Sequence, residues 1–409
     1  MKVVHIATTD GGGAGIGMLN LHHSLLANGI DSYVLVATKT SNDDSVIKME
    51  PNHNLFHWSK NKLVHKAQKI LRRRGKLKTP VEYFDSLIKE LSKITPGAFF
   101  TSPISNYDVT QHPLYQSADI VHLHWISNFV DIPTFFSHNN KPIIWTLRDE
   151  NPGLGGFHYR TDKNKYGTAW SELENTFLKI KKEALENYTN ISLVALSDKM
   201  TDFCGNVDYL KNKRITKVYN PIDWTKYTII EKHVAKKALG IDPDSAVVSF
   251  VSIALNDERK GLLDLVSALD QMDINKKLLC VGHDDGSIRR DYMRCFGSIE
   301  DSYLMSLIYS ASDIFVNPSK QESFGKTIVE ALLCGTPVAT TPVGIAPEII
   351  DDSNGALMMD VYGETIRAAI NIVISEKYNY GSVRNRTKDV FDPNNIAKQY
   401  INIYQNLLA

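Results

Sequence analysis

The chain has 409 residues, of which 43% are hydrophobic and 22% charged, an ordinary composition for a globular protein and a length that allows two domains. The 46 Lys and Arg residues balance the 46 Asp and Glu residues, so the formal net charge is zero. A chain without excess positive charge is not built to hold nucleic acid, and we expect no nucleic-acid partner.

The cysteines and the N-terminal sequence indicate in which cellular compartment the protein is expected. The four cysteines are Cys204, Cys280, Cys295 and Cys334. They show neither metal-site spacing nor a disulfide framework, and they lie in or beside apolar runs, which indicates reduced thiols and a cytoplasmic protein. Met1 and Lys2 lead directly into a strand, with no signal peptide and no apolar run near 18 residues. We therefore expect any contact with the inner face of the cell membrane to be peripheral.

The chain opens with a predicted β-α-β unit: a strand at 2–7, a helix that ends near Asn28, and a strand at 33–37. A glycine-rich segment that includes Gly13 and Gly15 follows the first strand. No register of its glycines gives G-x-G-x-x-G, so a dinucleotide-binding dehydrogenase is not indicated. Glycines let the backbone approach a ligand and expose N–H groups; the alternative is a tight turn without a ligand.

A basic segment stands out at residues 60–78. It carries nine Lys or Arg residues, and no acidic residue occurs between Glu50 and Glu82. Its apolar residues recur at helical spacing, which predicts a basic amphipathic helix. Such a helix can lie on an anionic membrane surface; the alternative is a surface helix that packs its apolar stripe on the domain.

Polar residues lie within or after two further predicted strands, at 120–125 and 143–147. Because α/β sheets bind ligands at the carboxyl ends of their strands, these residues are candidates for a binding site. They are His122, His124, Arg148, Asp149 and His158. A lone histidine is more often structural than functional, so a structural role is the alternative for each of the three.

The second half of the chain predicts parallel strands at 247–253, 277–281, 314–316 and 338–340, with helices between them. One helix opens near Gly325 and runs to about Cys334. Its N-terminus offers unpaired N–H groups and a partial positive charge, which suit a diphosphate. Glu322 and Glu330 flank this helix end and suit sugar hydroxyl groups, since carboxylates only accept hydrogen bonds. The alternative is an amphipathic helix with two solvated glutamates.

Residues 309–350 closely resemble the donor-binding half of glycosyltransferase family 4. They carry, in the family's order, Glu322-Ser323-Phe324-Gly325, Glu330, Cys334-Gly335-Thr336-Pro337 and Gly344. The resemblance implies an α/β protein of the GT-B fold, with two Rossmann-like doubly wound parallel-sheet domains facing a central cleft. We expect an acceptor-side domain at 1–222, a nucleotide-sugar domain at 223–385, and a C-terminal helix at 386–409 that packs back on the first domain.

The resemblance also implies roles for individual residues. Glu322 would contact the transferred sugar, Glu330 would hold the ribose hydroxyls, and Lys260 would contact the donor diphosphate. The other donor-binding residues implied are Gly13, Gly15, Arg259, Gly297, Ser323, Phe324, Gly325, Lys326 and Thr327. We expect Glu322, Lys260 and Arg148 to be the catalytic residues. The acceptor-side candidates are His122, His124, Asp149 and His158.

Two positions depart from the pattern. The branch of the family found in exopolysaccharide and capsule assembly usually carries a histidine where this chain has Arg148, and an arginine is common where it has Ala254. An arginine cannot act as a base near neutral pH, but it can bind an anionic or hydroxyl-rich sugar. Arg259 is a possible substitute for the second missing cation, and a surface lysine is the alternative for Lys260.

The function implied is a retaining transfer of a sugar from a nucleoside diphosphate-sugar to a hydroxyl of a glycan or lipid-linked acceptor, in bacterial surface polysaccharide synthesis. We expect no dedicated metal site and no cofactor, with protein cations meeting the phosphate charge. The alternatives are a nucleotide-sugar epimerase or phosphorylase of the same fold, and a non-catalytic nucleotide-sugar-binding protein.

Overall fold

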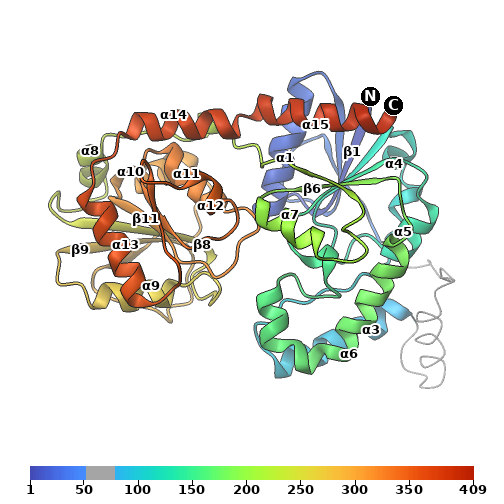
Figure 1. The fold of residues 1–409 in the computed structure, drawn as a ribbon, viewed down its shortest axis with the longest axis horizontal. Helices are drawn as coiled ribbons and strands as arrows, with labels where there is room; N and C mark the ends of the chain where they lie inside the picture. Colours follow the sequence, from blue (N-terminus) through green and yellow to red (C-terminus); the bar gives the residue numbers. More distant parts are fainter. Residues whose placement is uncertain (52–78) are drawn as a thin grey trace. The chain divides into compact units, whose positions relative to one another are not determined.

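The computed structural model describes residues 1–51 and 79–409 (Figure 1). The basic segment at 60–78, predicted to be an amphipathic helix, lies outside the described residues. The chain divides into two compact units, the first formed by Met1–Pro221 with Asn394–Ala409 and the second by Ile222–Pro393. Residues 386–393, which we expected to pack on the first domain, belong to the second unit.

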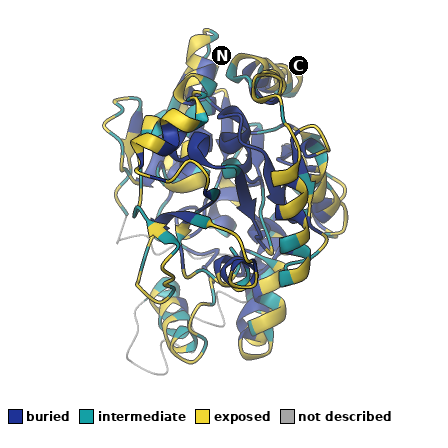
Figure 2. Cartoon of the chain, turned by 90° about the vertical axis from the view of Figure 1, so that its left-hand side faces the viewer, coloured by how far each residue is buried: buried dark blue, intermediate teal, exposed yellow. Residues whose placement is uncertain are grey.

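The first unit is built on a seven-stranded parallel sheet in the order β3-β2-β1-β4-β5-β6-β7 (Figure 1). The strands are β1 (Lys2–Thr9), β2 (Asp31–Thr38), β3 (Val46–Lys48), β4 (Ile120–Leu123), β5 (Ile143–Thr146), β6 (Ile191–Ala195) and β7 (Arg214–Lys217). The central strands are buried on both faces, which is why they appear in the sequence as continuous apolar runs. Figure 2 shows buried residues (dark blue) in the interior of the structure and exposed residues (yellow) on its outer helices and loops.

Helices cover both faces of this sheet. They are α1 (Gly12–Ala27), α3 (Pro80–Ile94), α4 (Pro113–Ser117), α5 (Ile132–His138), α6 (Arg160–Leu185), α7 (Asp198–Gly205) and α15 (Pro393–Leu408), with single 3-10 turns η1 (Val109–Gln111) and η2 (Asn151–Gly153). Side chains of α1 and α15 form one core cluster with Val3, Ile120 and Ile144, while the opposite sheet face packs on α5 and α6.

The second unit contains a six-stranded parallel sheet in the order β10-β9-β8-β11-β12-β13. The strands are β8 (Ala246–Ala254), β9 (Lys276–His283), β10 (Met293–Cys295), β11 (Ile314–Asn317), β12 (Val338–Thr340) and β13 (Gly355–Leu357). The helices are α8 (Lys232–Ala238), α9 (Leu262–Asp270), α10 (Ser302–Ala311), α11 (Lys326–Leu333), α12 (Ala346–Ile349), α13 (Gly363–Ser375) and α14 (Tyr380–Phe391), with the 3-10 turn η3 (Trp224–Lys226). Helices α9 and α13 share one core cluster with β8 and β11.

Across residues 1–51 and 79–409, no helix combines the length and the hydropathy that a membrane crossing requires.

Helix α15 is fixed to the first unit by polar as well as apolar contacts. The Tyr404 hydroxyl lies 2.8 Å from His122 Nδ1, and the Tyr400 hydroxyl lies 3.0 Å from Thr146 Oγ1. Both tyrosines are fully buried. These contacts attach the last helix to the carboxyl ends of β4 and β5, because His122 and Thr146 belong to those strands.

Replacing Tyr404 with Phe should therefore destabilise the protein. The substitution keeps the ring but leaves His122 Nδ1 without its partner, at a cost of about 1–3 kcal/mol. Thermal unfolding should show a melting temperature lower by several degrees than in wild type. The control is Tyr303→Phe, since Tyr303 is 63% exposed; equal melting temperatures for the two variants would contradict the assigned contact.

Candidate functional site

In the second unit, the loop from β11 leads to the N-terminus of α11. The helix begins at Lys326, slightly later than the sequence predicted, and Gly325 before it has φ 100°. This left-handed conformation suits glycine, and no side chain caps the helix. Ser323 and Phe324 precede Gly325, and Thr327 lies in the first helical turn. The helix therefore presents backbone N–H groups and a partial positive charge at this end.

Lys260 and Glu322 meet beside this helix end. Lys260 Nζ lies 2.5 Å from Glu322 Oε1, and the Ser319 hydroxyl oxygen lies 3.0 Å from the same carboxylate oxygen. The two charged side chains are 24% and 16% exposed, so they are accessible without being fully solvated. The structure thus brings together two residues that are 62 positions apart in the sequence and were both predicted to contact the donor.

Glycines allow the loops that carry these residues to cross closely. A Cβ at Gly261 would lie 2.4 Å from the Pro318 carbonyl oxygen, and a Cβ at Gly344 would lie 2.3 Å from that of Phe324. The Lys320 amide also donates to the Arg259 carbonyl at 2.7 Å. Arg259 itself contacts the Asp257 carboxylate at 2.8 Å. The loops at 257–261, 318–325 and 341–345 therefore form one packed support for the ion pair.

Glu330 is buried inside the second unit and is only 5% exposed, so a solvated position for it is excluded. Its Oε1 accepts from the Tyr227 hydroxyl at 2.6 Å and pairs with Lys326, and its Oε2 accepts from the Tyr309 hydroxyl at 3.1 Å. Burial, followed by the charge of Glu330, raises the pKa of both tyrosines, which keeps them protonated as donors. Sequence reasoning missed these partners, because no spacing signal connects Tyr227 with Glu330.

Two predicted glycines have different surroundings. A Cβ at Gly15 would lie 2.3 Å from the Asp10 carbonyl carbon, so glycine is required there by the turn between β1 and α1. Gly13 meets nothing within 4 Å. The segment predicted as a glycine-rich loop is largely the first turns of α1, which starts at Gly12. In the second unit, Gly297 has φ 71°, and its carbonyl accepts from the Gly282 amide at 2.9 Å.

In the first unit, two of the predicted acceptor-side residues, Asp149 and His158, are in direct contact. Asp149 Oδ2 lies 2.5 Å from His158 Nδ1 and accepts from the Trp125 indole at 2.8 Å. His158 Nε2 lies 2.9 Å from Thr101 Oγ1, and the Phe99 ring stacks on the imidazole at 4.1 Å. Asp149 is 5% exposed and His158 is fully buried. This geometry favours a structural role in which the pair holds the loop after β5.

The same loop is anchored to α6 by two buried ionisable side chains, Lys181 and Glu174. Lys181 Nζ donates to the Asn151 carbonyl at 2.7 Å and to the Leu154 carbonyl at 3.0 Å, and Glu174 accepts from the Gly155 and Gly156 amides. Burial lowers the pKa of Lys181 to about 7, against the opposing charge of Glu174. The glycines are needed here, since a Cβ at Gly155 would lie 2.0 Å from the Glu174 carbonyl oxygen.

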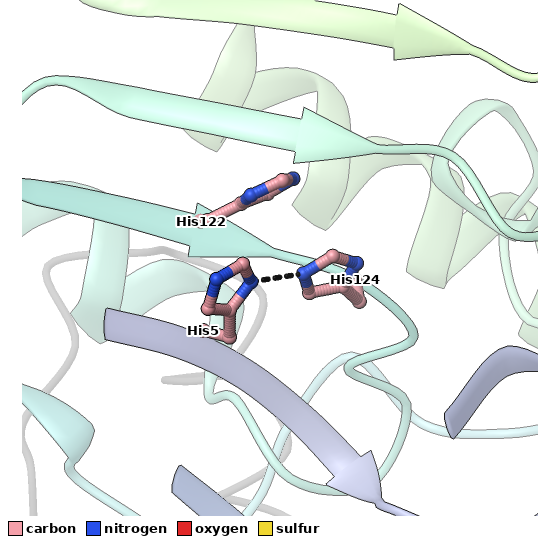
Figure 3. Close-up of side chains that lie close together, drawn as sticks. All are labelled: His5, His122 and His124. Atoms are coloured by element: carbon pink, nitrogen blue, oxygen red, sulfur yellow. Dashed lines mark hydrogen bonds between the residues drawn. The ribbon is translucent and has the colours of Figure 1, made fainter. Parts of the chain in front are cut away.

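His122 and His124 lie in the interior with His5 (Figure 3). Burial is the largest cause that lowers the pKa of all three imidazoles well below the usual range, so they are neutral. The charge of His122 comes next for His5 and His124, and the positive charge of Arg148 contributes for all three. His122 is held between the Tyr404 hydroxyl and Thr146 Oγ1, both at 2.8 Å. His124 Nε2 lies 2.8 Å from His5 Nδ1.

These three histidines place ring nitrogens within 4.8 Å of one another, but they do not fit a metal ion. The His122 and His124 rings are stacked, with centroids 4.1 Å apart and planes 28° apart, so their in-plane lone pairs do not converge on one point (Figure 3). Both His122 nitrogens also face hydroxyl groups, and a guanidinium lies beside His124. The expectation that the protein uses no metal remains a prediction.

Arg148 lies at the carboxyl end of β5 and is 8% exposed. Its Nη1 donates to Asn220 Oδ1, its Nη2 lies 2.9 Å from His124 Nδ1, and its Nε has no partner among the described residues. Burial lowers the pKa of Arg148 to about 10, which leaves it charged at neutral pH. It cannot serve as a base there, in agreement with the chemistry expected of arginine.

The chain is similar over its whole length to sucrose-phosphate synthase from Thermosynechococcus elongatus, with a TM-score of 0.67, 19% identity and 99% of that chain covered. It is similar over 99% of its length to Anabaena HepE in complex with UDP and glucose, with a TM-score of 0.63, 15% identity and 99% coverage.

The fold is GT-B. This confirms the fold class predicted from the sequence. Residues 245–375 match the family model of group 1 glycosyl transferases, a range that includes Lys260, Glu322, Gly325 and Glu330.

Sequence relatives agree with this match. An uncharacterized glycosyltransferase of Methanocaldococcus jannaschii is 25% identical over 313 residues, which are 70% of this chain and 75% of that protein. The N-acetyl-alpha-D-glucosaminyl L-malate synthase of Bacillus anthracis is 29% identical over 214 residues, which are 48% of this chain and 55% of that protein. Together the family match and the relatives support a glycosyltransferase and favour it over an epimerase, a phosphorylase or a binding protein.

Replacing Lys181 with Met should weaken the loop after β5. The substitution removes the donor shared by the Asn151 and Leu154 carbonyls in a buried place, and we expect a loss of at least about 2 kcal/mol. Chemical denaturation would measure it, with Lys179→Met on the same helix as control, since the Lys179 side chain is 59% exposed. Equal stability of the two variants would contradict an anchoring role for Lys181.

Replacing Glu330 with Gln should destabilise the second unit. The new amide would place N–H groups toward a tyrosine hydroxyl or the Lys326 ammonium, which are already donors, at a cost of about 1–3 kcal/mol. The control is Glu376→Gln, because Glu376 is exposed at the end of α13. The urea midpoints of unfolding of the two variants are compared with that of wild type. A midpoint of Glu330→Gln equal to those of wild type and of Glu376→Gln would contradict the buried hydrogen-bond network.

Proposed function

We propose that the protein is a retaining, metal-independent glycosyltransferase that moves a sugar from a nucleoside diphosphate-sugar to a hydroxyl of a glycan or lipid-linked acceptor. We further propose that it acts in bacterial surface polysaccharide synthesis of the exopolysaccharide or capsule type. The observation that carries the proposal is the Lys260–Glu322 pair beside the uncapped N-terminus of α11.

The pair has the capacity to bind both parts of such a donor. An ammonium has three N–H donors, and the contact with Glu322 uses one, so two remain for phosphate oxygens. Lys260 and Ser319 both contact Oε1 of Glu322, so Oε2 is available to accept from a sugar hydroxyl. The helix end adds backbone N–H groups and a partial positive charge for the diphosphate.

The chemical step follows from this placement. The bond between the anomeric carbon and the diphosphate oxygen breaks, and the acceptor oxygen bonds to the same face of the anomeric carbon. The departing diphosphate takes the acceptor's hydroxyl proton, so charge and atoms balance. Lys260 and the α11 N-terminus stabilise the negative charge that grows on the leaving group. A uridine diphosphate donor is supported by HepE, whose structure contains UDP and glucose.

The predicted membrane contact through residues 60–78 is part of this proposal. A lipid-linked acceptor would be reached most readily by an enzyme held at the membrane surface. Co-sedimentation with anionic vesicles tests it: binding that persists after the basic residues are neutralised, or no binding at all, would contradict it.

Lys260→Ala and Glu322→Ala should each lower transfer by roughly 10²–10³-fold, because each removes an interaction with the charge or the sugar that changes during the reaction. A panel of nucleoside diphosphate-sugars, screened by thermal shift, would first identify the donor. Nucleotide release and product formation would then be measured.

Lys320→Ala is the matched control, because Lys320 lies in the same loop but is 43% exposed and pairs with Asp264. Wild-type turnover in both Lys260→Ala and Glu322→Ala would contradict the proposed function. Donor binding without transfer to any acceptor would favour a binding protein instead.

A further inference from the structure

Arg148 carries a buried positive charge that the first unit does not neutralise. Its two hydrogen-bond partners are an amide, Asn220, and an imidazole, His124. The adjacent Asp149 accepts hydrogen bonds from Trp125 and His158 and has no contact with the guanidinium. No carboxylate pairs with Arg148 among the described residues. A buried charge without a counterion is costly, which makes this position unusual for a purely structural residue.

The neighbouring histidines cannot supply the missing negative charge, and the hydrogen-bond chain fixes their tautomers. Arginine only donates, so His124 Nδ1 must accept and His124 must carry its proton on Nε2. His124 Nε2 then donates to His5 Nδ1, which places the proton of His5 on Nε2. That nitrogen has no partner in the described part of the chain. Both imidazoles in this series of hydrogen bonds are therefore neutral. Each bond is donated in the direction that leads away from Arg148, from the guanidinium to His124 and from His124 to His5.

Two features leave the guanidinium able to bind more. It has five N–H donors, and the contacts with Asn220 and His124 account for two of them. Gly17, in the second turn of α1, gives it room: a Cβ there would lie 2.7 Å from Nη1. The side chain thus lies against the N-terminal half of α1, whose helix dipole adds to the positive potential. Because Arg148 is 8% exposed, solvent reaches part of it.

We propose that Arg148 binds an anionic group, a carboxylate or a phosphate, on the acceptor. This rests on the proposed function in one respect, that the bound molecule is the acceptor. Planar guanidinium groups bind both anions through paired N–H donors, and burial strengthens the interaction. The acceptor class would then be an acidic saccharide or a phosphorylated one, and a neutral hydroxyl-bearing sugar would bind less tightly.

Thermal shift of the full-length protein tests this inference at constant ionic strength. Glucuronate and glucose form a matched pair that differs at C6, where a carboxylate replaces a hydroxymethyl group, and inorganic phosphate represents a phosphorylated acceptor. We expect glucuronate, phosphate or both to raise the melting temperature by at least about 2 °C at saturation, and glucose to do so less. A shift with glucuronate alone indicates an acidic sugar, and a shift with phosphate alone indicates a phosphorylated acceptor.

Variants assign the shift to Arg148. In Arg148→Gln the anion-dependent rise should disappear, while the melting temperature without anion should be equal to or above that of wild type, since an unpaired buried charge has been removed. Gly17→Ala should weaken the anion effect by displacing the guanidinium while keeping its charge. The control is Arg214→Gln, an exposed arginine on β7 of the same unit, which should retain the full rise.

Two outcomes overturn the inference. One is the absence of an anion-dependent shift in wild type, and the other is a shift of equal size in Arg148→Gln. If Arg148→Gln melts well below wild type in plain buffer and wild type shows no shift, the residue is structural. The melting temperature of Lys260→Ala is measured with inorganic phosphate and, separately, with uridine diphosphate. This variant should lose the rise caused by uridine diphosphate but keep the rise caused by phosphate. Failure of the donor site is thereby distinguished from failure of the anion site.

Discussion

The close crossing of three loops in the second unit is the constraint on which the candidate donor site depends. Backbone atoms approach so tightly at Gly261 and Gly344 that any side chain there would overlap a carbonyl oxygen. This approach holds the loop of Lys260 against the loop of Glu322, and it leaves the two charges in contact beside the start of α11. The ion pair is therefore a consequence of backbone packing, and it does not itself have to hold the loops together.

Much of this fold could be predicted because its parallel strands are buried on both faces. Apolar runs marked β4, β5, β6, β8 and β11, and the resemblance to a known family supplied the donor-site motif. The two edge strands of the first sheet, β3 and β7, escaped prediction. β7 is exposed at both ends and partly exposed between them, so its residues show no apolar run, and β3 contains only three residues. Helix α3 was also missed in a region without a clear pattern.

The candidate site was predictable only where local motifs carried the signal. Lys260 and Glu322 were found because each sits next to a glycine or a helix start. The partners of Glu330 were not, because Tyr227 and Tyr309 reach it from distant parts of the sequence. In the first unit the predicted histidines are present but lie in the interior, where His122 and His124 engage neighbouring side chains. Sequence order gave no indication of that burial.

The docking of α15 on the first unit has a consequence for how the protein is made. Val3, Ile120 and Ile144 share one core cluster with Tyr400 and Tyr404 of this helix and with side chains of α1. During synthesis these apolar side chains lack their contacts with α15 until the ribosome has released a segment that lies about 250 to 400 residues further along the chain. A fragment that stopped at Pro221 would keep that surface bare, and we expect it to aggregate where the intact chain stays dispersed.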